Sequence, residues 1–217
     1  MWLPPHISLT LPRYTIIRRD RPQGRSGGVL LAFRNSLIHT QLTLPQWQGS
    51  SMEVVAAQVG LQSDWLTVVA CYNPAGNATQ QEYDHYFSTL PQPVLIMGDF
   101  NTHHQRWNPS LLLRNHNPTG TALFQTLLDS PHLSFLSPPG LATYLHPHTG
   151  APSVLDLFLG DSTFQSSQFS TGSYMGSDHL PLLATLPHTC PRPHPGLGSK
   201  KPYLIPMSPH SNLTKQF

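Results

Sequence analysis

The sequence predicts an α/β fold in which sheets are layered with helices on the outside. Many short stretches rich in β-branched and aromatic residues, bounded by Gly, Pro and Asn, have the character of strands. Only two stretches repeat apolar residues at helical spacing. The 217-residue chain suits one domain, expected over residues 1–187, followed by a Pro-rich tail over residues 188–217 whose composition predicts disorder.

The first third of the chain predicts a run of neighbouring strands. They are expected over residues 14–19, 28–34, 53–60 and 65–72. Only residues 61–64 separate the last two strands. Consecutive strands with a short connection favour an antiparallel part of a sheet.

Two helices are expected further along. The first begins at Thr79, which fits a capping box with Glu82. Its apolar residues at helical spacing are Tyr83, Tyr86, Phe87 and Leu90. The second helix is expected over residues 119–130. Its predicted apolar face consists of Phe124, Leu127 and Leu128.

A buried strand is predicted between these helices, within PVLIMGDFN at residues 93–101. Its apolar run is typical of a central strand covered on both faces. Gly98 permits a tight turn, after which Asp99 and Asn101 point to the same face of an extended backbone. Polar groups at the end of a buried strand are typical of a ligand site. A simple turn with an Asx hydrogen bond is the alternative for this stretch alone.

The C-terminal third of the domain predicts five short strands, at residues 133–136, 142–145, 154–159, 163–170 and 179–186. The strand at 154–159 is apolar but is preceded by Ser153 and contains Asp156. A buried carboxylate without a partner costs several kcal/mol, so Asp156 is expected to have one.

The charged residues are unevenly distributed. They make up only 10% of the chain, and six arginines lie before residue 35: Arg13, Arg18, Arg19, Arg21, Arg25 and Arg34. An acidic middle beside a basic segment fits a metal site next to a surface that binds a phosphate backbone. A solvated basic strand explains the same pattern equally well.

The two cysteines are Cys71, within a predicted strand, and Cys190, in the tail. Cys71 is expected to be a buried free thiol, and no disulfide framework follows. These features predict an intracellular protein, with the nucleus as a candidate location. No stretch approaches about 18 apolar residues, so no membrane span is expected.

Four short motifs carry candidate chemistry. They are Tyr72-Asn73-Pro74, Asp99 with Asn101, Ser153 to Asp156, and Ser177-Asp178-His179. One arrangement uses them all: His179 meets Asp156, Asp178 faces a metal or a water, and Tyr72 lies at the rim. Carboxylates for Mg²⁺ beside a His–Asp pair favour metal-assisted attack of water on phosphorus.

Three residues of the following loop, His103, His104 and Trp107, are further candidates to line this site. Trp107 is expected to stack on a base. Arg25 is the second residue expected to contact nucleic acid. An ordinary loop is the favoured interpretation of the two adjacent histidines, because adjacent imidazoles rarely bind one ion.

The ordered motifs resemble the endonuclease/exonuclease/phosphatase superfamily. The stretches YTIIRRDRPQGRSGGVLLAFRNSL and GDFNTHHQRWNP are similar to the apurinic-endonuclease-like domain of non-LTR (LINE-type) retrotransposons. The resemblance implies a four-layer, deoxyribonuclease-I-like α/β sandwich of two packed mixed sheets flanked by helices. It also implies a monomer that cleaves DNA phosphodiester bonds with Mg²⁺ or Mn²⁺.

The resemblance assigns a role to each motif. Asp99 activates or orients the water and belongs, with Asp178, to the metal side. Asn101 and Tyr72 contact the phosphate. His179, with Asp156, stabilises the transition state or acts as base. Ser153 and Ser177 support the site.

One departure from the family pattern stands out. The family places a metal-binding Glu near its N-terminus, and neither Glu53 nor Glu82 matches that position. The chain is therefore expected to lack the first strand and helix, and a Pro-rich tail replaces the reverse transcriptase that normally follows. An impaired endonuclease, an inactive remnant that at most binds nucleic acid, and a lipid or inositol phosphatase remain the alternatives.

Removal of residues 187–217 is expected to leave the melting temperature nearly unchanged, because a segment of this composition cannot bury enough apolar surface to pack. Thermal unfolding of the full and shortened chains tests this expectation. A decrease of more than about 5 °C means that the tail packs against the domain.

Overall fold

The computed structural model describes residues 7–21, 27–62 and 64–186. The predicted tail and Cys190 lie outside these residues. The central element is a six-stranded sheet, and all its neighbouring strands are antiparallel except β5 and β6, which are parallel. Its order is β3 (His39–Leu42), β4 (Glu53–Gly60), β5 (Trp65–Tyr72), β6 (Val94–Asp99), β10 (Asp156–Gly160) and β7 (Ser134–Phe135).

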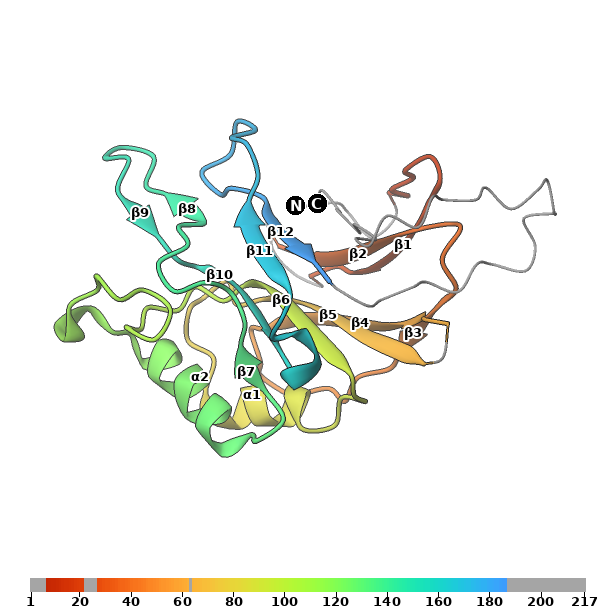
Figure 1. The fold of residues 1–217 in the computed structure, drawn as a ribbon, viewed down its shortest axis with the longest axis horizontal. Helices are drawn as coiled ribbons and strands as arrows, with labels where there is room; N and C mark the ends of the chain where they lie inside the picture. The colour runs from red at the N-terminus through yellow and green to blue at the C-terminus, as the bar shows by residue number, and fades with distance from the viewer. Residues whose placement is uncertain (1–6, 22–26, 63, 187–217) are drawn as a thin grey trace.

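Three two-stranded antiparallel ribbons complete the described strands. They are β1 (Tyr14–Arg19) with β2 (Val29–Arg34), β11 (Gln168–Thr171) with β12 (Leu182–Thr185), and β8 (Tyr144–Leu145) with β9 (Pro152–Ser153). The first two ribbons lie over one face of the large sheet, and helices α1 (Gln80–Phe87) and α2 (Pro118–Asp129) lie under the other (Figure 1). Two short 3₁₀ turns span Leu113–Asn115 and Ser162–Phe164.

Two hydrophobic cores follow from the alternation of side chains along the strands. On β4, Val54 and Ala56 join the core shared with the helices, whereas Val55 and Ala57 join the core under the ribbons. The sheet is therefore buried on both faces, which explains why β5 and β6 are nearly continuous apolar runs. The predicted α/β sandwich of mixed sheets is confirmed. The described residues form three layers, helices, large sheet and ribbons, and not the four layers predicted, because both described α-helices lie on the same face of the large sheet.

Helix α1 begins as predicted, because Thr79 and Glu82 form both hydrogen bonds of a capping box. Helix α2 begins at Pro118 with Asn117 as its cap. Its predicted face was wrong in one position: Leu128 is 60% exposed, and Leu123 is fully buried instead. The backbone of Gly120 packs against His103, which leaves no room for a Cβ and sets the rotation of the helix.

The C-terminal strands are shorter than predicted. Within the expected strand 163–170, residues Ser162–Phe164 form a 3₁₀ turn that Asp161 caps, and β11 begins only at Gln168. Within the expected strand 179–186, β12 begins at Leu182, after Pro181, which has no amide N–H for a ladder. Strand β3 was not predicted from the sequence, because it is short and polar. The antiparallel run β3–β4–β5 and the buried free thiol of Cys71 are confirmed.

None of the described helices is long or apolar enough to cross a lipid bilayer.

Gly98→Ala is expected to destabilise the protein by more than about 3 kcal/mol, or to prevent folding. Gly98 has a φ of +150°, and a Cβ would overlap the carbonyl oxygen of Cys71 in the neighbouring strand. Gly49→Ala is the matched control, since Gly49 also has positive φ (+83°) but no atom within 4 Å of its Cβ position. It should cost only about 1–2 kcal/mol. Urea unfolding compares the two variants, and equal losses would refute the steric argument.

Candidate active site

Four neighbouring strands each place a polar residue at the same end of the large sheet. Asp99 pairs with Tyr72 on one side and with Asp156 on the other, and Tyr72 pairs in turn with Glu53. Paired residues point to the same face of a sheet. Their alternate neighbours on each strand belong to the core under the ribbons, so the four side chains form one polar row at the end of that core.

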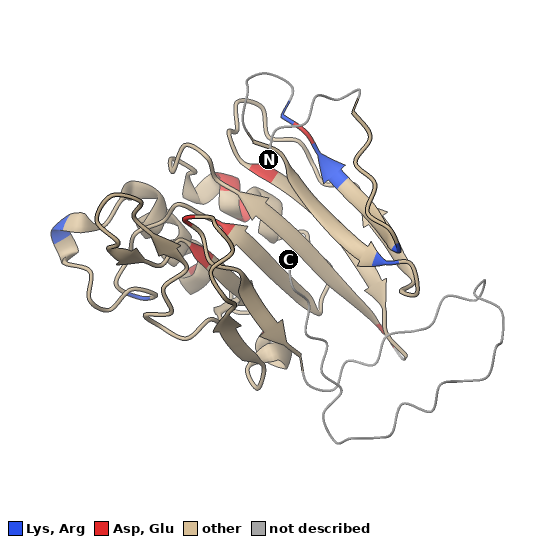
Figure 2. Ribbon diagram, turned by 90° about the horizontal axis from the view of Figure 1, so that it is seen from above, with Lys and Arg blue, Asp and Glu red and all other residues tan. Residues whose placement is uncertain are grey.

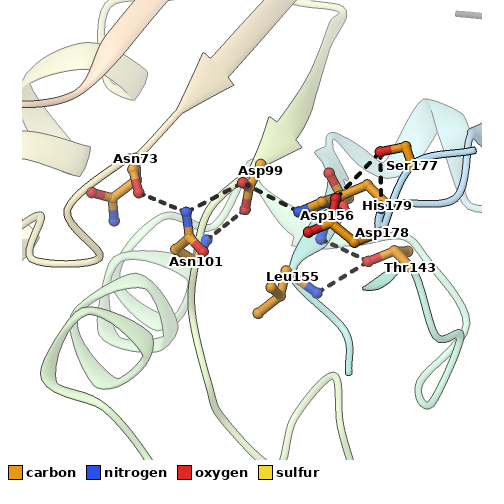
Figure 3. Close-up of polar contacts among 9 residues, drawn as sticks. All are labelled: Asn73, Asp99, Asn101, Thr143, Leu155, Asp156, Ser177, Asp178 and His179. Carbon is orange, nitrogen blue, oxygen red and sulfur yellow. Dashed lines mark hydrogen bonds and ion pairs between the residues drawn. The ribbon is translucent and has the colours of Figure 1, made fainter. Parts of the chain in front are cut away.

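The loop before β12 supplies His179 to this row. Its Nδ1 lies 2.8 Å from Oδ2 of Asp156, and its Nε2 lies 4.0 Å from Oδ2 of Asp99 (Figure 3). The imidazole also meets the ring of Tyr144 edge-on at 5.0 Å. The hydrogen bond to Asp156 is the main reason why the pKa of His179 is raised, since it stabilises the imidazolium.

Thr143 holds Asp156 in position, a role that no motif in the sequence indicates. Its hydroxyl oxygen accepts hydrogen bonds from the backbone N–H groups of Leu155 and Asp156 at 3.1 and 2.9 Å (Figure 3). Its own carbonyl accepts from Leu180 N–H at 2.7 Å. One buried threonine therefore ties the start of β10 to the loop that carries His179.

Asn101 orients the carboxylate of Asp99. The backbone N–H and the side-chain amide of Asn101 donate to the two oxygens of Asp99 at 3.0 and 3.2 Å. The same amide nitrogen donates to the carbonyl of Asn73 at 3.0 Å (Figure 3). Asn101 has a φ of +48°, a conformation that asparagine tolerates better than most residues. Both amide protons of Asn101 are therefore used within the protein.

Asn73 lies beneath this arrangement and is fully buried. Its amide nitrogen is 3.0 Å from the carbonyl oxygen of Phe100 and 3.1 Å from the hydroxyl of Thr119. The hydroxyl of Tyr83 lies at 3.3 Å. Asn73 therefore fixes the ends of β5 and β6 against both helices.

The pKa of Asp99 is raised to about 6, chiefly by burial and secondly by the nearby charge of Asp156. The hydrogen bonds from Asn101 and the charge of His179 oppose this rise. Tyr72 is half-buried, and burial together with Asp99 raises the pKa of its hydroxyl. The site thus combines a crowded carboxylate, an imidazole that favours its cation and a neutral hydroxyl.

The other predicted site residues do not belong to the polar row. Asp178 is exposed, and its carboxylate accepts a long hydrogen bond (3.4 Å) from Ser177, whose hydroxyl also accepts from His179 N–H at 3.2 Å. Ser153 contributes its backbone, since its carbonyl accepts from Thr143 N–H at 2.9 Å. Arg25 lies outside the described residues.

The prediction that Trp107 stacks on a base was wrong. Trp107 is fully buried in the helical core, and its indole N–H donates to the carbonyl of Thr102. His104 does not line the row either, because its ring packs against Phe124 and Trp107. An aromatic residue after a Gly-Asp turn packs equally well in a core, and the sequence does not distinguish the two roles.

Residues 66–183 match the endonuclease-reverse transcriptase family. The chain belongs to this family. Within the endonuclease/exonuclease/phosphatase superfamily, the fold is similar to the endonuclease domain of TRAS1, a telomere-specific non-LTR retrotransposon. That match has a TM-score of 0.62 and 16% identity, and it covers 80% of this chain and 78% of the other.

A second similar structure is that of D. rerio TDP2 humanized by 14 mutations. It has a TM-score of 0.50 and 11% identity, and the match covers 78% of this chain and 74% of the other. No curated protein matches the sequence. At these identities the structural matches establish the deoxyribonuclease-I-like fold, and the site must be argued from its own geometry.

The site of this endonuclease-reverse transcriptase family member offers carboxylate oxygens, which are the donors that hard divalent cations prefer. No group of three or more His, Cys, Asp or Glu residues suited to a metal occurs in the described part of the chain. Mg²⁺ commonly binds through one or two carboxylates and keeps several waters. Asp99 lies in register with Asp156 and has a raised pKa, and Asp178 is exposed on the loop before β12, so these carboxylates are the candidate ligands.

Asp99→Asn is expected to stabilise this protein by about 1–3 kcal/mol in EDTA at pH 8, although it changes a residue of the site. The raised pKa of Asp99 means that the folded state binds a proton more tightly than the unfolded state. Stability is therefore lost as pH rises from about 4 to about 6 and is not regained above. His179, also with a raised pKa, adds stability below about 6.5 that is lost at higher pH.

Melting temperatures of wild type and Asp99→Asn between about pH 4 and 8 measure the effect. The two curves should approach each other toward pH 4, below which Asp99 becomes protonated in the unfolded state as well, and they should reach their full separation above about pH 6. A variant less stable than wild type at pH 8 would contradict the assigned burial penalty.

Proposed function

We propose that this domain is an endonuclease that nicks DNA by metal-dependent hydrolysis of a phosphodiester bond. The observation that carries the proposal is the convergence of Asp99, Asn101, Asp156 and His179 at one end of the sheet. Membership of the endonuclease-reverse transcriptase family supports DNA as the substrate.

The gap between His179 and Asp99 suits the reacting oxygen. Nε2 and Oδ2 are 4.0 Å apart, too far for a direct hydrogen bond but suited to a water or phosphate oxygen between them. Asp99, with a pKa of about 6, is ionised at neutral pH and accepts the proton of the attacking water.

His179 then acts on the phosphate. Asp156 accepts the Nδ1 proton, which fixes the ring so that Nε2 faces the substrate. The raised pKa increases the cationic fraction, which stabilises negative charge as it develops on phosphorus-bound oxygen.

The neutral groups orient the phosphate. The hydroxyl of Tyr72 remains protonated and donates to a phosphate oxygen. Mg²⁺ or Mn²⁺, held by Asp99 and Asp178 beside Asn101, would neutralise charge on the phosphate. The carbonyl of Asn73 and the amide of Asn101 keep Asp99 directed toward that region.

Asp99→Ala and His179→Ala are each expected to reduce Mg²⁺-dependent nicking of supercoiled plasmid by about 10²–10⁴-fold, because each removes a proton-transfer or charge-stabilising group. EDTA should abolish nicking by the wild type. His132→Ala and Asp129→Ala, which change the same residue types outside the site, should retain activity. Undiminished cleavage by Asp99→Ala or His179→Ala would sink the proposal.

A further inference from the structure

The fourth member of the polar row, Glu53, has no part in the reaction proposed above. It is buried, with 6% exposure, although it lies only two strands from Asp99. Its partner is Arg21, from the turn after β1, whose Nε lies 2.5 Å from Oε1 of Glu53. The other carboxylate oxygen accepts a hydrogen bond from Gly28 N–H. Both oxygens are therefore used to hold the turn and its cation at the end of the sheet.

The guanidinium of Arg21 is held firmly, but one of its nitrogens has no hydrogen-bond partner among the described residues. The backbone of Gly27 packs against it so closely that a Cβ would lie 2.5 Å from Cζ. Nη2 is buried and has no hydrogen-bond partner within the described ranges. The side chain is nevertheless 26% exposed. A planar cation with donors to spare suits an anionic oxygen ligand.

Arg21 also lies on the substrate side of the row. Burial, Asp99 and Glu53 raise the pKa of the Tyr72 hydroxyl and the charge of Arg21 lowers it, so this hydroxyl lies within electrostatic reach of all three charged groups. In Figure 2, cationic residues lie along the β1–β2 ribbon and acidic residues lie at the adjoining end of the large sheet. Tyr72 thus lies between a cation held by Glu53 and the reaction centre at Asp99.

The spacing fits a nucleic-acid strand. Glu53 and Asp99 are separated by two inter-strand steps, or about 10 Å. Each strand of B-DNA advances about 3.4 Å along the axis per nucleotide and winds around the axis as well, so this distance corresponds to phosphates about one or two nucleotides apart. A strand whose scissile phosphate lies at Asp99 and His179 would bring another phosphate to Arg21.

We propose that Arg21 binds a backbone phosphate of the substrate strand flanking the scissile one, and that Glu53 is the positioning residue that orients its guanidinium. The inference rests on the proposed nuclease function. The competing explanation is a purely structural ion pair that anchors the turn. The two explanations differ in the number of phosphate contacts that the protein makes.

The test measures binding of a short fluorescent DNA duplex by anisotropy in EDTA, with the full chain and with salt varied between about 50 and 200 mM. The variant is Arg21→Gln/Glu53→Gln. It leaves the net charge unchanged and avoids the unpaired buried carboxylate that Arg21→Gln alone would create. Arg34→Gln is the control: it removes a cation at the far end of β1–β2, where Arg34 pairs with Tyr14.

The double variant is expected to bind more weakly, with the slope of log K against log salt reduced by about 0.9, which is one phosphate contact. Arg34→Gln should keep the wild-type slope. Glu53→Gln alone should keep the cation of Arg21 but lose affinity, because the guanidinium is no longer oriented. Arg21→Lys should keep the wild-type slope without full affinity, because a lysine lacks the planar fork.

A wild-type slope in the double variant, with the wild type nicking plasmid normally, overturns this inference alone. Wild-type protein that neither binds the duplex nor nicks plasmid overturns the proposed function as well. Loss of nicking in His179→Ala with an unchanged salt slope supports both, since it separates the reaction centre from the phosphate contact.

Discussion

Two carboxylates face each other across neighbouring strands, and the rest of the site depends on the charge that they create. Asp99 and Asp156 are paired in register at the end of a buried sheet. Two neighbouring residues compensate that negative charge. Asn101 donates two hydrogen bonds to Asp99, and His179 donates one to Asp156 and lies near Asp99. The compensation is incomplete, because the pKa of Asp99 is still raised. A site with uncompensated negative charge attracts a cation, and the same charge lowers the stability of the folded protein when no cation is bound.

The loops that carry these groups are fixed by polar side chains, two of them buried (Asn73 and Thr143) and one half-buried (Asn117). Asn73 joins the ends of β5 and β6 to both helices. Asn117 caps α2 while its amide donates to the carbonyl of Asn101. Thr143 binds two consecutive amides at the start of β10. Because Asn73 and Thr143 are buried, the loss of one of their partners leaves the others without a hydrogen bond, so the loops have one favourable arrangement.

The sequence predicted the parts of this structure that are governed by periodicity and by short-range capping. Runs of apolar and β-branched residues located β4, β5 and β6, and the capping box located α1. The order of the motifs indicated the family and the pairing of His179 with Asp156. It did not indicate Thr143, Asn117 or the Arg21–Glu53 pair, whose roles depend on contacts between distant segments. The prediction for Trp107 was wrong for the same reason, since its burial depends on tertiary packing.

The polar row acquires its order from where the covering ribbon stops. The β1–β2 ribbon ends at the Arg19–Val29 pair, and the turn beyond it brings Arg21 over Glu53. At the other side, the loop before β12 brings His179 over Asp156. Each end of the row is thus closed by a cation-forming side chain, while Tyr72 and Asp99 lie between them. An extended polyanion would lie across such a strip more readily than a compact phosphate ester, because its successive phosphates can reach both closed ends together.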